Sequence, residues 1–166
     1  MTFRPDLVST WIYREPDPVD PGAVELLLMR RSFGRPLAGL WQPVTGRIEP
    51  GERVALAALR EVEEETGIGR LDIEAFYDLD LVSLFHWSSA DAVLSEVVFA
   101  VRVGMGVEPA LSVEHDDFRW VDPYEAVRAV IWPAYREAIE RIATVLTDPE
   151  RRRWFETTME GDRAVL

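Results

Sequence analysis

The chain contains neither cysteine nor lysine among its 166 residues. Without cysteine, disulfides and thiolate chemistry are both excluded. Apart from two histidines, every basic residue is arginine. We attribute this bias to a GC-rich coding sequence rather than to a function.

Long apolar runs are also absent, and no stretch is long enough to cross a membrane as a helix. The first residues, MTFRPDLVST, lack the hydrophobic region that a secretory signal requires. From these absences we expect a soluble, cytoplasmic protein with no membrane partner.

Positive charge is scarce in this chain. Its 18 arginines face 30 acidic residues, which gives a formal net charge of −12. Such a chain repels a nucleic-acid backbone, so we expect no nucleic-acid partner. Small polyphosphates stay open as ligands, because a bound metal ion inverts the local field. The length suits one domain with a full core, and we expect residues 1–166 to form it.

Hydrophobic patterning predicts strands mixed with a few helices. The expected strands cover residues 7–13, 24–30, 41–44, 73–84, 94–103 and 118–121. The expected helices cover residues 53–66, a short stretch opened by Pro123, residues 133–146, and a last piece from Pro149 through Trp154 and Phe155. This order of elements indicates either an α+β fold or an α/β/α sandwich.

The most informative stretch is residues 46–68, GRIEPGERVALAALREVEEETGI. A glutamate-rich helical run is usually a solvated face. On a helix, however, Glu61, Glu64 and Glu65 fall within an arc of roughly 100°, whereas Glu63 lies across from them. They flank a narrow stripe suited to a core, which consists of Ala55, Ala58, Leu59, Val62 and Thr66.

Three like charges on one helix face are unfavourable unless water or a cation compensates them. Several carboxylate oxygens suit a hard divalent cation such as magnesium or manganese. Arg60 adjoins Glu61, and Glu52 lies about two turns earlier, so an Arg–Glu pair would hold Glu61 in place. Gly67 follows the run, where a helix C-terminus favours a left-handed residue. The pattern therefore predicts a metal-binding helix.

The same stretch reads G-x5-E-x7-R-E-U-x-E-E-x-G-U, where U is a bulky aliphatic residue. This pattern resembles the signature box of the Nudix hydrolases, and weaker resemblance extends on both sides of it. The matching positions are Gly46, Glu52, Arg60, Glu61, Val62, Glu64, Glu65, Gly67 and Ile68.

The resemblance implies an α/β/α sandwich with a mixed sheet in which the box forms a helix. It also implies a Mg²⁺ site, with Mn²⁺ as the alternative, held by Glu61, Glu64 and Glu65 with the Thr45 carbonyl. Metal there would neutralise a diphosphate and activate a water molecule. Family members differ in their general base, so that role stays open. Glu61, beside Arg60, is our first choice, and a carboxylate outside the cluster is the alternative.

Glu114, in the segment SVEHDDFRWV, is the main candidate for a further carboxylate. Taken alone, it would be a solvated loop acid. The segment resembles a subgroup of the family that contributes a distal metal-binding or base glutamate from this position. Glu96 is its competitor, and Asp116 and Asp117 are weaker ones. We expect His115 to form hydrogen bonds rather than to bind a hard metal.

The segment WQPVTGRIEPGE and the tail WPAYREAIERI resemble the dihydroneopterin triphosphate pyrophosphatases, also known as dATP pyrophosphohydrolases. That likeness implies cleavage of a nucleoside or pterin triphosphate to a monophosphate and pyrophosphate. Residues 85–92 depart from the subgroup, so the base stays open. The alternatives are hydrolysis of a nucleotide sugar or a dinucleoside polyphosphate, and a nucleotide sensor without turnover.

Four residues outside the box are candidates for contact with a small nucleotide-like substrate. Arg30 and Arg31 end an apolar run and could reach phosphates. Trp41 and Gln42 precede the box and could stack on a base and hydrogen-bond to it, although Trp41 could equally belong to the core. A homodimer also stays open, since the apolar residues near 154–155 could pack on the domain or join two copies.

Overall fold

The computed structural model of the chain describes residues 4–17, 19–20 and 23–165. Its strands are β1 (Leu7–Arg14), β2 (Glu25–Arg31), β3 (Trp41–Gln42), β4 (Val44–Arg47), β5 (Ile73–Trp87), β6 (Ala92–Val103), β7 (His115–Val121) and β8 (Glu156–Thr157). Its helices are α1 (Val54–Thr66), α2 (Pro123–Ala129), α3 (Pro133–Arg141) and α4 (Pro149–Arg152), with short turns η1 (Arg70–Asp72) and η2 (Ile142–Leu146).

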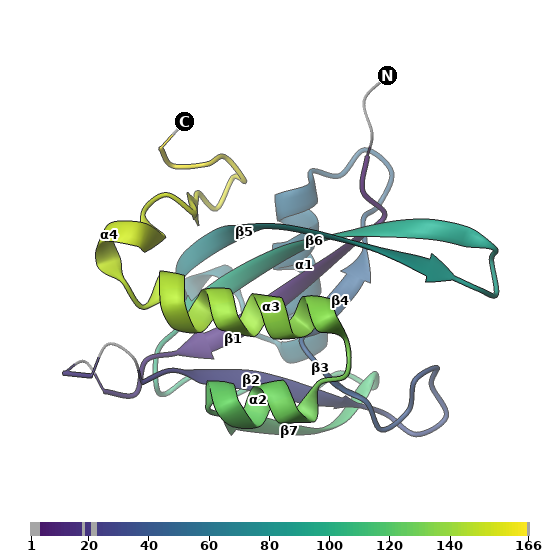
Figure 1. The fold of residues 1–166 in the computed structure, drawn as a ribbon, viewed down its shortest axis with the longest axis horizontal. Coiled ribbons are helices and arrows are strands. Elements are labelled where there is room, and N and C mark those ends of the chain that lie inside the picture. Colours follow the sequence, from purple (N-terminus) through teal and green to yellow (C-terminus); the bar gives the residue numbers. More distant parts are fainter. Residues whose placement is uncertain (1–3, 18, 21–22, 166) are drawn as a thin grey trace.

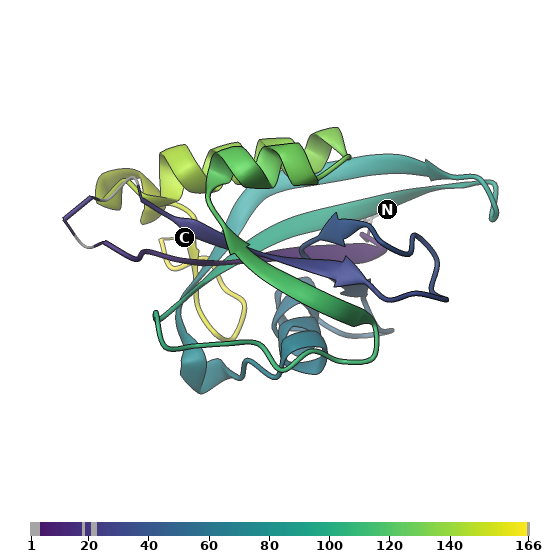
Figure 2. The same cartoon turned by 90° about the horizontal axis from the view of Figure 1, so that it is seen from below.

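The strands form one mixed sheet in the order β3-β2-β1-β6-β5-β8, with β4 paired to β1 and β7 paired to β2. The pair β1–β6 is parallel, and the other pairs are antiparallel. Helices α2 and α3 cover one face, and α1 lies on the other (Figures 1 and 2). The predicted α/β/α sandwich with a mixed sheet is confirmed.

Each face of the sheet carries its own core. Along β1 the side chains alternate, so Trp11 and Tyr13 enter the core beneath α3, whereas Val8 and Ile12 enter the core beneath α1. Trp11 meets the ring of Tyr135 on α3 edge-on, with ring centroids 5.7 Å apart. Burial on both faces explains why apolar residues occur on both sides of β1, five of its eight residues in all.

The box helix α1 begins one residue later than predicted, and its whole predicted stripe is buried. Ala57 and Glu65 are buried as well. The small alanine side chains let α1 lie close to the sheet. The helix ends at Gly67, whose φ is 69° and whose N–H donates to the Glu63 carbonyl. This left-handed C-cap is the one predicted from the motif.

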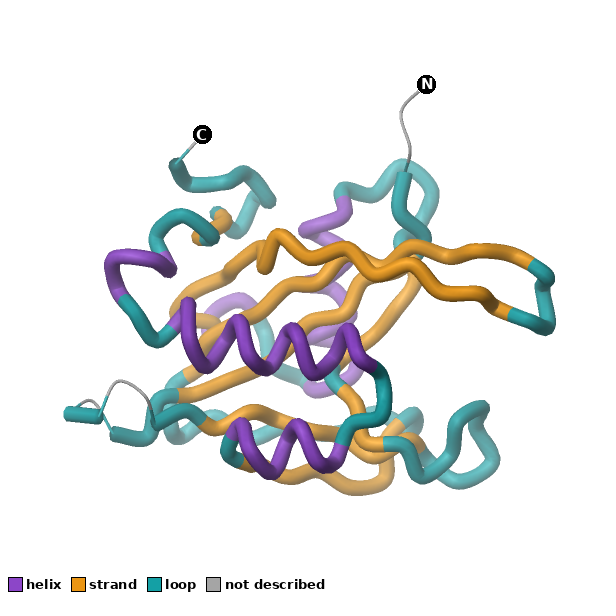
Figure 3. Tube along the Cα trace, viewed as in Figure 1, coloured by secondary structure: helices purple, strands orange, loops and turns teal. Residues whose placement is uncertain are grey.

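Several boundaries differ from the prediction. The single strand predicted for residues 41–44 is two strands, because Pro43 between them has no N–H to donate. The loop expected near 87–92 is shorter, since β5 and β6 continue to Trp87 and Ala92 as a hairpin that extends beyond the helices (Figure 3). Strand β7 begins at His115 rather than Phe118.

The helix predicted for residues 133–146 is α3 followed by the wider turn η2. Tyr135, Ile139, Ile142 and Leu146 form the buried face of this segment. Helix α4 ends at Arg152, so Trp154 and Phe155 lie outside it. Phe155 packs against the core beneath α3, whereas Trp154 is 54% exposed. No helix in the described part of the chain is both long and apolar enough to cross a membrane.

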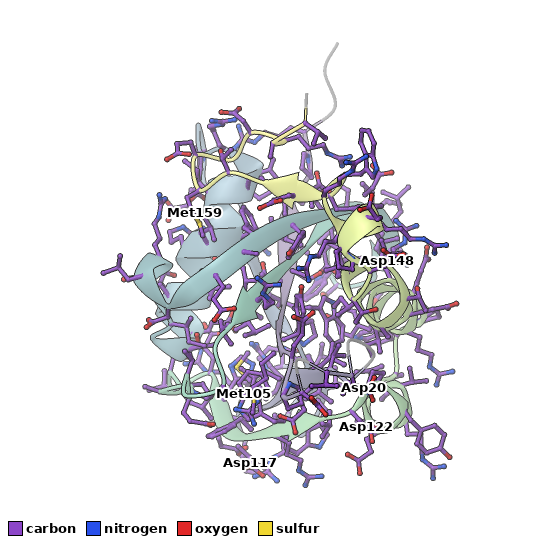
Figure 4. All side chains as sticks on the ribbon, turned by 90° about the vertical axis from the view of Figure 1, so that its left-hand side faces the viewer. Asp20, Met105, Asp117, Asp122, Asp148 and Met159 are labelled. Atoms are coloured by element: carbon purple, nitrogen blue, oxygen red, sulfur yellow. The ribbon has the colours of Figure 1, made fainter. Side chains whose placement is uncertain are left out.

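The C-terminal segment returns to the start of α1. Strand β8 pairs with β5 at the sheet edge. Met159 packs against the core on the α1 side of the sheet, and Figure 4 labels it near α1. The Arg53 guanidinium, just before α1, donates to Asp162 at 2.6 Å and to the Gly161 carbonyl at 3.2 Å. The tail thereby holds the end of the helix that carries the predicted site.

Candidate active site

The Arg60 guanidinium organises the acidic face of α1. It donates to both Glu52 oxygens at 2.8 and 3.0 Å, to Glu61 Oε1 at 2.7 Å and to Glu64 Oε2 at 3.2 Å. A further N–H donates to the Arg47 carbonyl at 2.9 Å. The hydrogen bonds from Arg60 hold the pKa of the Glu52 carboxyl below its usual range. The predicted ion pair between Arg60 and Glu52 is therefore present, and it is bidentate.

Glu61 lies against the backbone of Gly46 on β4. Its side chain is 13% exposed. A Cβ on Gly46 would overlap the Glu61 carboxyl group, so only glycine leaves room for it. Burial raises the pKa of Glu61, the hydrogen bond from Arg60 lowers it, and the charges of Glu64 and Glu114 raise it further. Gly46, the first glycine of the motif, thus makes space for the carboxyl group of Glu61.

Glu65 is the most deeply buried carboxyl group of the site, at 3% exposure. Burial, reinforced by the charges of Glu114 and Glu61, raises the pKa of Glu65 to about 9. The Thr45 backbone and the charge of Arg31 act in the opposite direction. Glu65 Oε2 has no hydrogen-bond partner. Without a cation, this carboxyl group is protonated at neutral pH.

Glu64 differs from its two neighbours, because its side chain is 58% exposed. As the side chains stand, no three His, Asp or Glu residues in the described ranges are arranged to hold a metal ion. Arg60 instead occupies the space facing Glu61 and Glu64. The donor set still fits a hard cation: it consists of carboxylates, one buried oxygen lacks a partner, and the acids raise one another's pKa values.

Glu114 is placed beside the cluster, as the sequence predicts. Its charge raises the pKa values of both Glu61 and Glu65. Its Oε2 accepts a hydrogen bond from Arg31 at 2.8 Å. Arg31 is therefore at the site, where its charge neutralises part of the acidic field.

The competing acids have other partners. Glu96 is buried at 7% exposure, where burial raises its pKa and a hydrogen bond with Ser9 lowers it. Its charge raises the pKa of Tyr135 on α3, as does the charge of Glu65. Asp116 accepts a hydrogen bond from Arg30 at 2.7 Å, and Asp117 lies 3.8 Å from the same guanidinium. Figure 4 labels Asp117 at the lower edge of the molecule, on β7. These two acids pair with Arg30 rather than joining the cluster.

Trp41 and Arg30 lie together, separate from Gln42 and Arg31, because neighbouring residues of a strand face opposite sides. The Arg30 guanidinium is 5.8 Å from the centre of the Trp41 ring, and that of Arg119 is 4.3 Å from it. Trp41 packs partly on the core and also lines a groove of about 390 Å³. The other lining residues are Leu28, Arg119, Trp120, Val121, Glu125 and Ala129.

Two contacts of the site were not predicted. Gln42 is 4% exposed and reaches His115 rather than the groove, with 3.3 Å between Gln42 Nε2 and His115 Nε2. Arg4 donates to the carbonyls of Glu49 and Glu52 and so fixes the turn before α1. The hydrogen-bonding role of His115 was predicted, but its partners were not. For Arg4 the sequence carries no signal at all.

A family model, the NUDIX domain, matches residues 8–142. The chain belongs to the Nudix hydrolase family. The arginine-held glutamates of α1, the box glycines and the α/β/α sandwich are therefore features of a Nudix hydrolase.

Three relatives of this Nudix hydrolase differ in their described activities. The asymmetrical bis(5'-nucleosyl)-tetraphosphatase of Sus scrofa is 37% identical over 110 residues, which are 65% of this chain and 71% of that protein. An octanoyltransferase of Myxococcus xanthus is 40% identical over 118 residues, which are 70% of this chain. The match covers only 31% of that longer protein. The Escherichia coli dihydroneopterin triphosphate pyrophosphohydrolase structure shares the fold, with a TM-score of 0.69, 24% identity, and coverage of 84% of this chain and 95% of that one.

Replacing Gly46 with alanine should displace Glu61, because the new Cβ overlaps its carboxyl group. We expect hydrolase activity to fall about 100-fold and the free energy of unfolding to fall by about 1–3 kcal/mol. Gly106→Ala is the control, since nothing lies within 4 Å of a Cβ there. Kinetics and urea unfolding measure both effects, and near-normal activity in Gly46→Ala would refute the packing argument.

The buried Glu65 should make stability depend on pH in EDTA. Its folded pKa of about 9 lies above the ordinary value of 4.5, so the folded chain holds a proton that the unfolded chain releases. Stability therefore falls as pH rises between these values, by up to about 1.4 kcal/mol per pH unit from this group. Glu65→Gln should flatten urea-unfolding stability between pH 5 and 8.5, whereas Glu63→Gln should not. Equal slopes for all three proteins would contradict the assignment.

Proposed function

We propose that this Nudix hydrolase is a magnesium-dependent pyrophosphohydrolase that cleaves a phosphoanhydride bond of a nucleoside polyphosphate. The observation that carries the proposal is the proximity of two carboxyl groups with little exposure: Glu61, which Arg60 holds, and the buried Glu65. Their pKa values are raised, and Glu65 Oε2 lacks a partner. Burying such groups without a compensating cation has a large energetic cost, so their presence at one site favours a metal-binding function.

The ligands in this proposal are Glu61, Glu64 and Glu65, with the Thr45 carbonyl and Glu114. When bound, the divalent cation neutralises phosphate charge and makes an attacking water a better nucleophile. The all-oxygen donor set favours Mg²⁺, with Mn²⁺ as the alternative. Arg60 holds Glu61 and Glu64 side by side, so it acts on the reaction through the ligands that it orients.

The reaction requires a base for the attacking water. Glu61 remains our first choice, and Glu114, in the turn just before β7, is the alternative outside α1. The water oxygen forms a bond to phosphorus, the phosphoanhydride P–O bond breaks, and the water proton passes to the base. The leaving phosphate departs with the bonding electron pair on its oxygen.

The proposed contacts with phosphates and with a base lie on opposite faces of β2 and β3. Arg31, beside Glu114, is placed to meet phosphates near the cluster. Trp41, with Arg30 above its ring, offers a flat surface to a base. Gln42 is too deeply buried to read a base, so we assign it to the support of the site instead.

The sequence relatives favour a dinucleoside polyphosphate as the substrate, since the pig tetraphosphatase is 37% identical and is matched over 71% of its length. A nucleoside or pterin triphosphate is the second candidate, supported by the resemblance of the segments around the box. A nucleotide sensor without turnover is disfavoured, because a pure binder does not need the full set of arginine-held carboxylates.

A substrate panel with product identification tests this proposal. With Mg²⁺, diadenosine tetraphosphate should yield ATP and AMP, and a triphosphate such as dATP should yield a monophosphate and pyrophosphate. A nucleotide sugar would instead yield two monophosphates. EDTA should abolish turnover, and added Mg²⁺ should restore it. Nucleotide binding without any product release would refute the enzymatic proposal.

The two neighbouring glutamates Glu63 and Glu64 provide a matched pair of variants on the best substrate. Glu64→Gln should lower kcat/KM about 100-fold or more, because a metal-binding oxygen loses its charge. Glu63→Gln removes the same charge one residue away, on the opposite side of α1, and should change activity less than twofold. Circular dichroism checks that both variants fold. Unchanged activity in Glu64→Gln would show that the metal assignment is wrong.

A further inference from the structure

His115, the first residue of β7, is enclosed between two polar side chains. Its own side chain is 0% exposed. Its Nε2 lies 3.3 Å from Gln42 Nε2, and its Nδ1 lies 3.6 Å from Glu65 Oε2. Neither His115 Nδ1 nor Glu65 Oε2 has any other hydrogen-bond partner. Two buried polar atoms without partners therefore face each other across a short gap.

Gln42 determines which ring nitrogen carries the proton. A side-chain amide nitrogen can only donate hydrogen bonds, so His115 Nε2 must accept one. The ring then bears its proton on Nδ1, the atom that faces Glu65. The same Gln42 nitrogen lies 3.4 Å from Thr45 Oγ1, to which it donates its other N–H. Gln42, His115 and Glu65 thus form a directed chain of donors and acceptors.

We propose that His115 is a positioning residue that orients Glu65 for the cation, and that Gln42 sets its tautomer. The inference rests on the proposed function, since it assigns Glu65 to the metal. In the charged state of Glu65, the Nδ1–H donates to Oε2, the 3.6 Å gap closes to hydrogen-bond distance, and the other oxygen is left for the metal. Ligating carboxylates are commonly held by such partners, whose loss weakens metal binding about 10–100-fold.

This arrangement also explains why Gln42 and His115 are buried. A side chain that contacts a nucleotide needs access to solvent, whereas both residues are at most 4% exposed. The histidine cannot itself bind the metal in this tautomer, because the nitrogen that faces the site carries a proton. Its effect on the reaction must therefore pass through Glu65.

The test uses the full chain and measures Mn²⁺ binding directly, by electron paramagnetic resonance of the free ion. His115→Phe keeps a buried ring without nitrogens and should weaken Mn²⁺ binding about tenfold or more. His115→Asn retains an amide donor near the Nδ1 position and should recover most of that loss. Gln42→Met frees the ring to adopt either tautomer and should weaken binding severalfold. Thermal melting reports whether each variant folds.

A second measurement separates positioning from general damage. In His115→Phe the Mg²⁺ concentration for half-maximal activity should rise with the loss of affinity, while kcat at saturating Mg²⁺ stays within about threefold. If His115→Phe does not fold, Gln42→Met decides the question, because it leaves the histidine in place. Folded variants that bind Mn²⁺ as tightly as the wild type would overturn this inference alone. A wild-type chain that binds no Mn²⁺ would overturn the proposed function with it.

Discussion

The arrangement of the site depends on one guanidinium group among many carboxylates. In a chain with a net charge of −12, acids on α1 would separate and turn towards water. Arg60 prevents this by binding Glu52 with two hydrogen bonds while it also contacts Glu61 and Glu64. The planar fork of arginine offers five N–H donors in fixed directions to several carboxylates, whereas lysine offers three rotatable donors from one atom. The helix face is thereby kept ready for a cation.

Packing supplies the second constraint. Helix α1 can bring carboxyl groups next to the sheet because three of its buried residues are alanines and because Gly46 has no side chain where Glu61 lies. The result is that three carboxyl groups on one helix differ in exposure. Glu65 is buried, Glu61 is slightly exposed, and Glu64 is exposed to solvent. In the proposed function, the buried Glu65 and the slightly exposed Glu61 are rigid ligands, and the substrate enters on the side of the exposed Glu64.

Much of this could be predicted from local patterns. Helical spacing correctly identified the buried stripe and the Glu52–Arg60 pair. The role that resemblance gives Glu114 stays a prediction, and the structure has this residue near the cluster. Helical angles could not reveal that Glu65 is buried while Glu64 is exposed, because that difference depends on which strands lie opposite. For the same reason Gln42 was a candidate for a hydrogen bond to the substrate's base. Its burial against His115 arises from the pairing of β2 with β3 and β7, which joins segments about 70 residues apart.

The central claim is that the acidic face of α1, which Arg60 organises, forms the binding site of a divalent cation. Anomalous diffraction from crystals grown with Mn²⁺ tests it most directly. The account predicts an anomalous peak within about 2.5 Å of carboxylate oxygens of Glu61, Glu64 and Glu65. A peak at other residues, or crystals of an active protein with no peak beside α1, would contradict it.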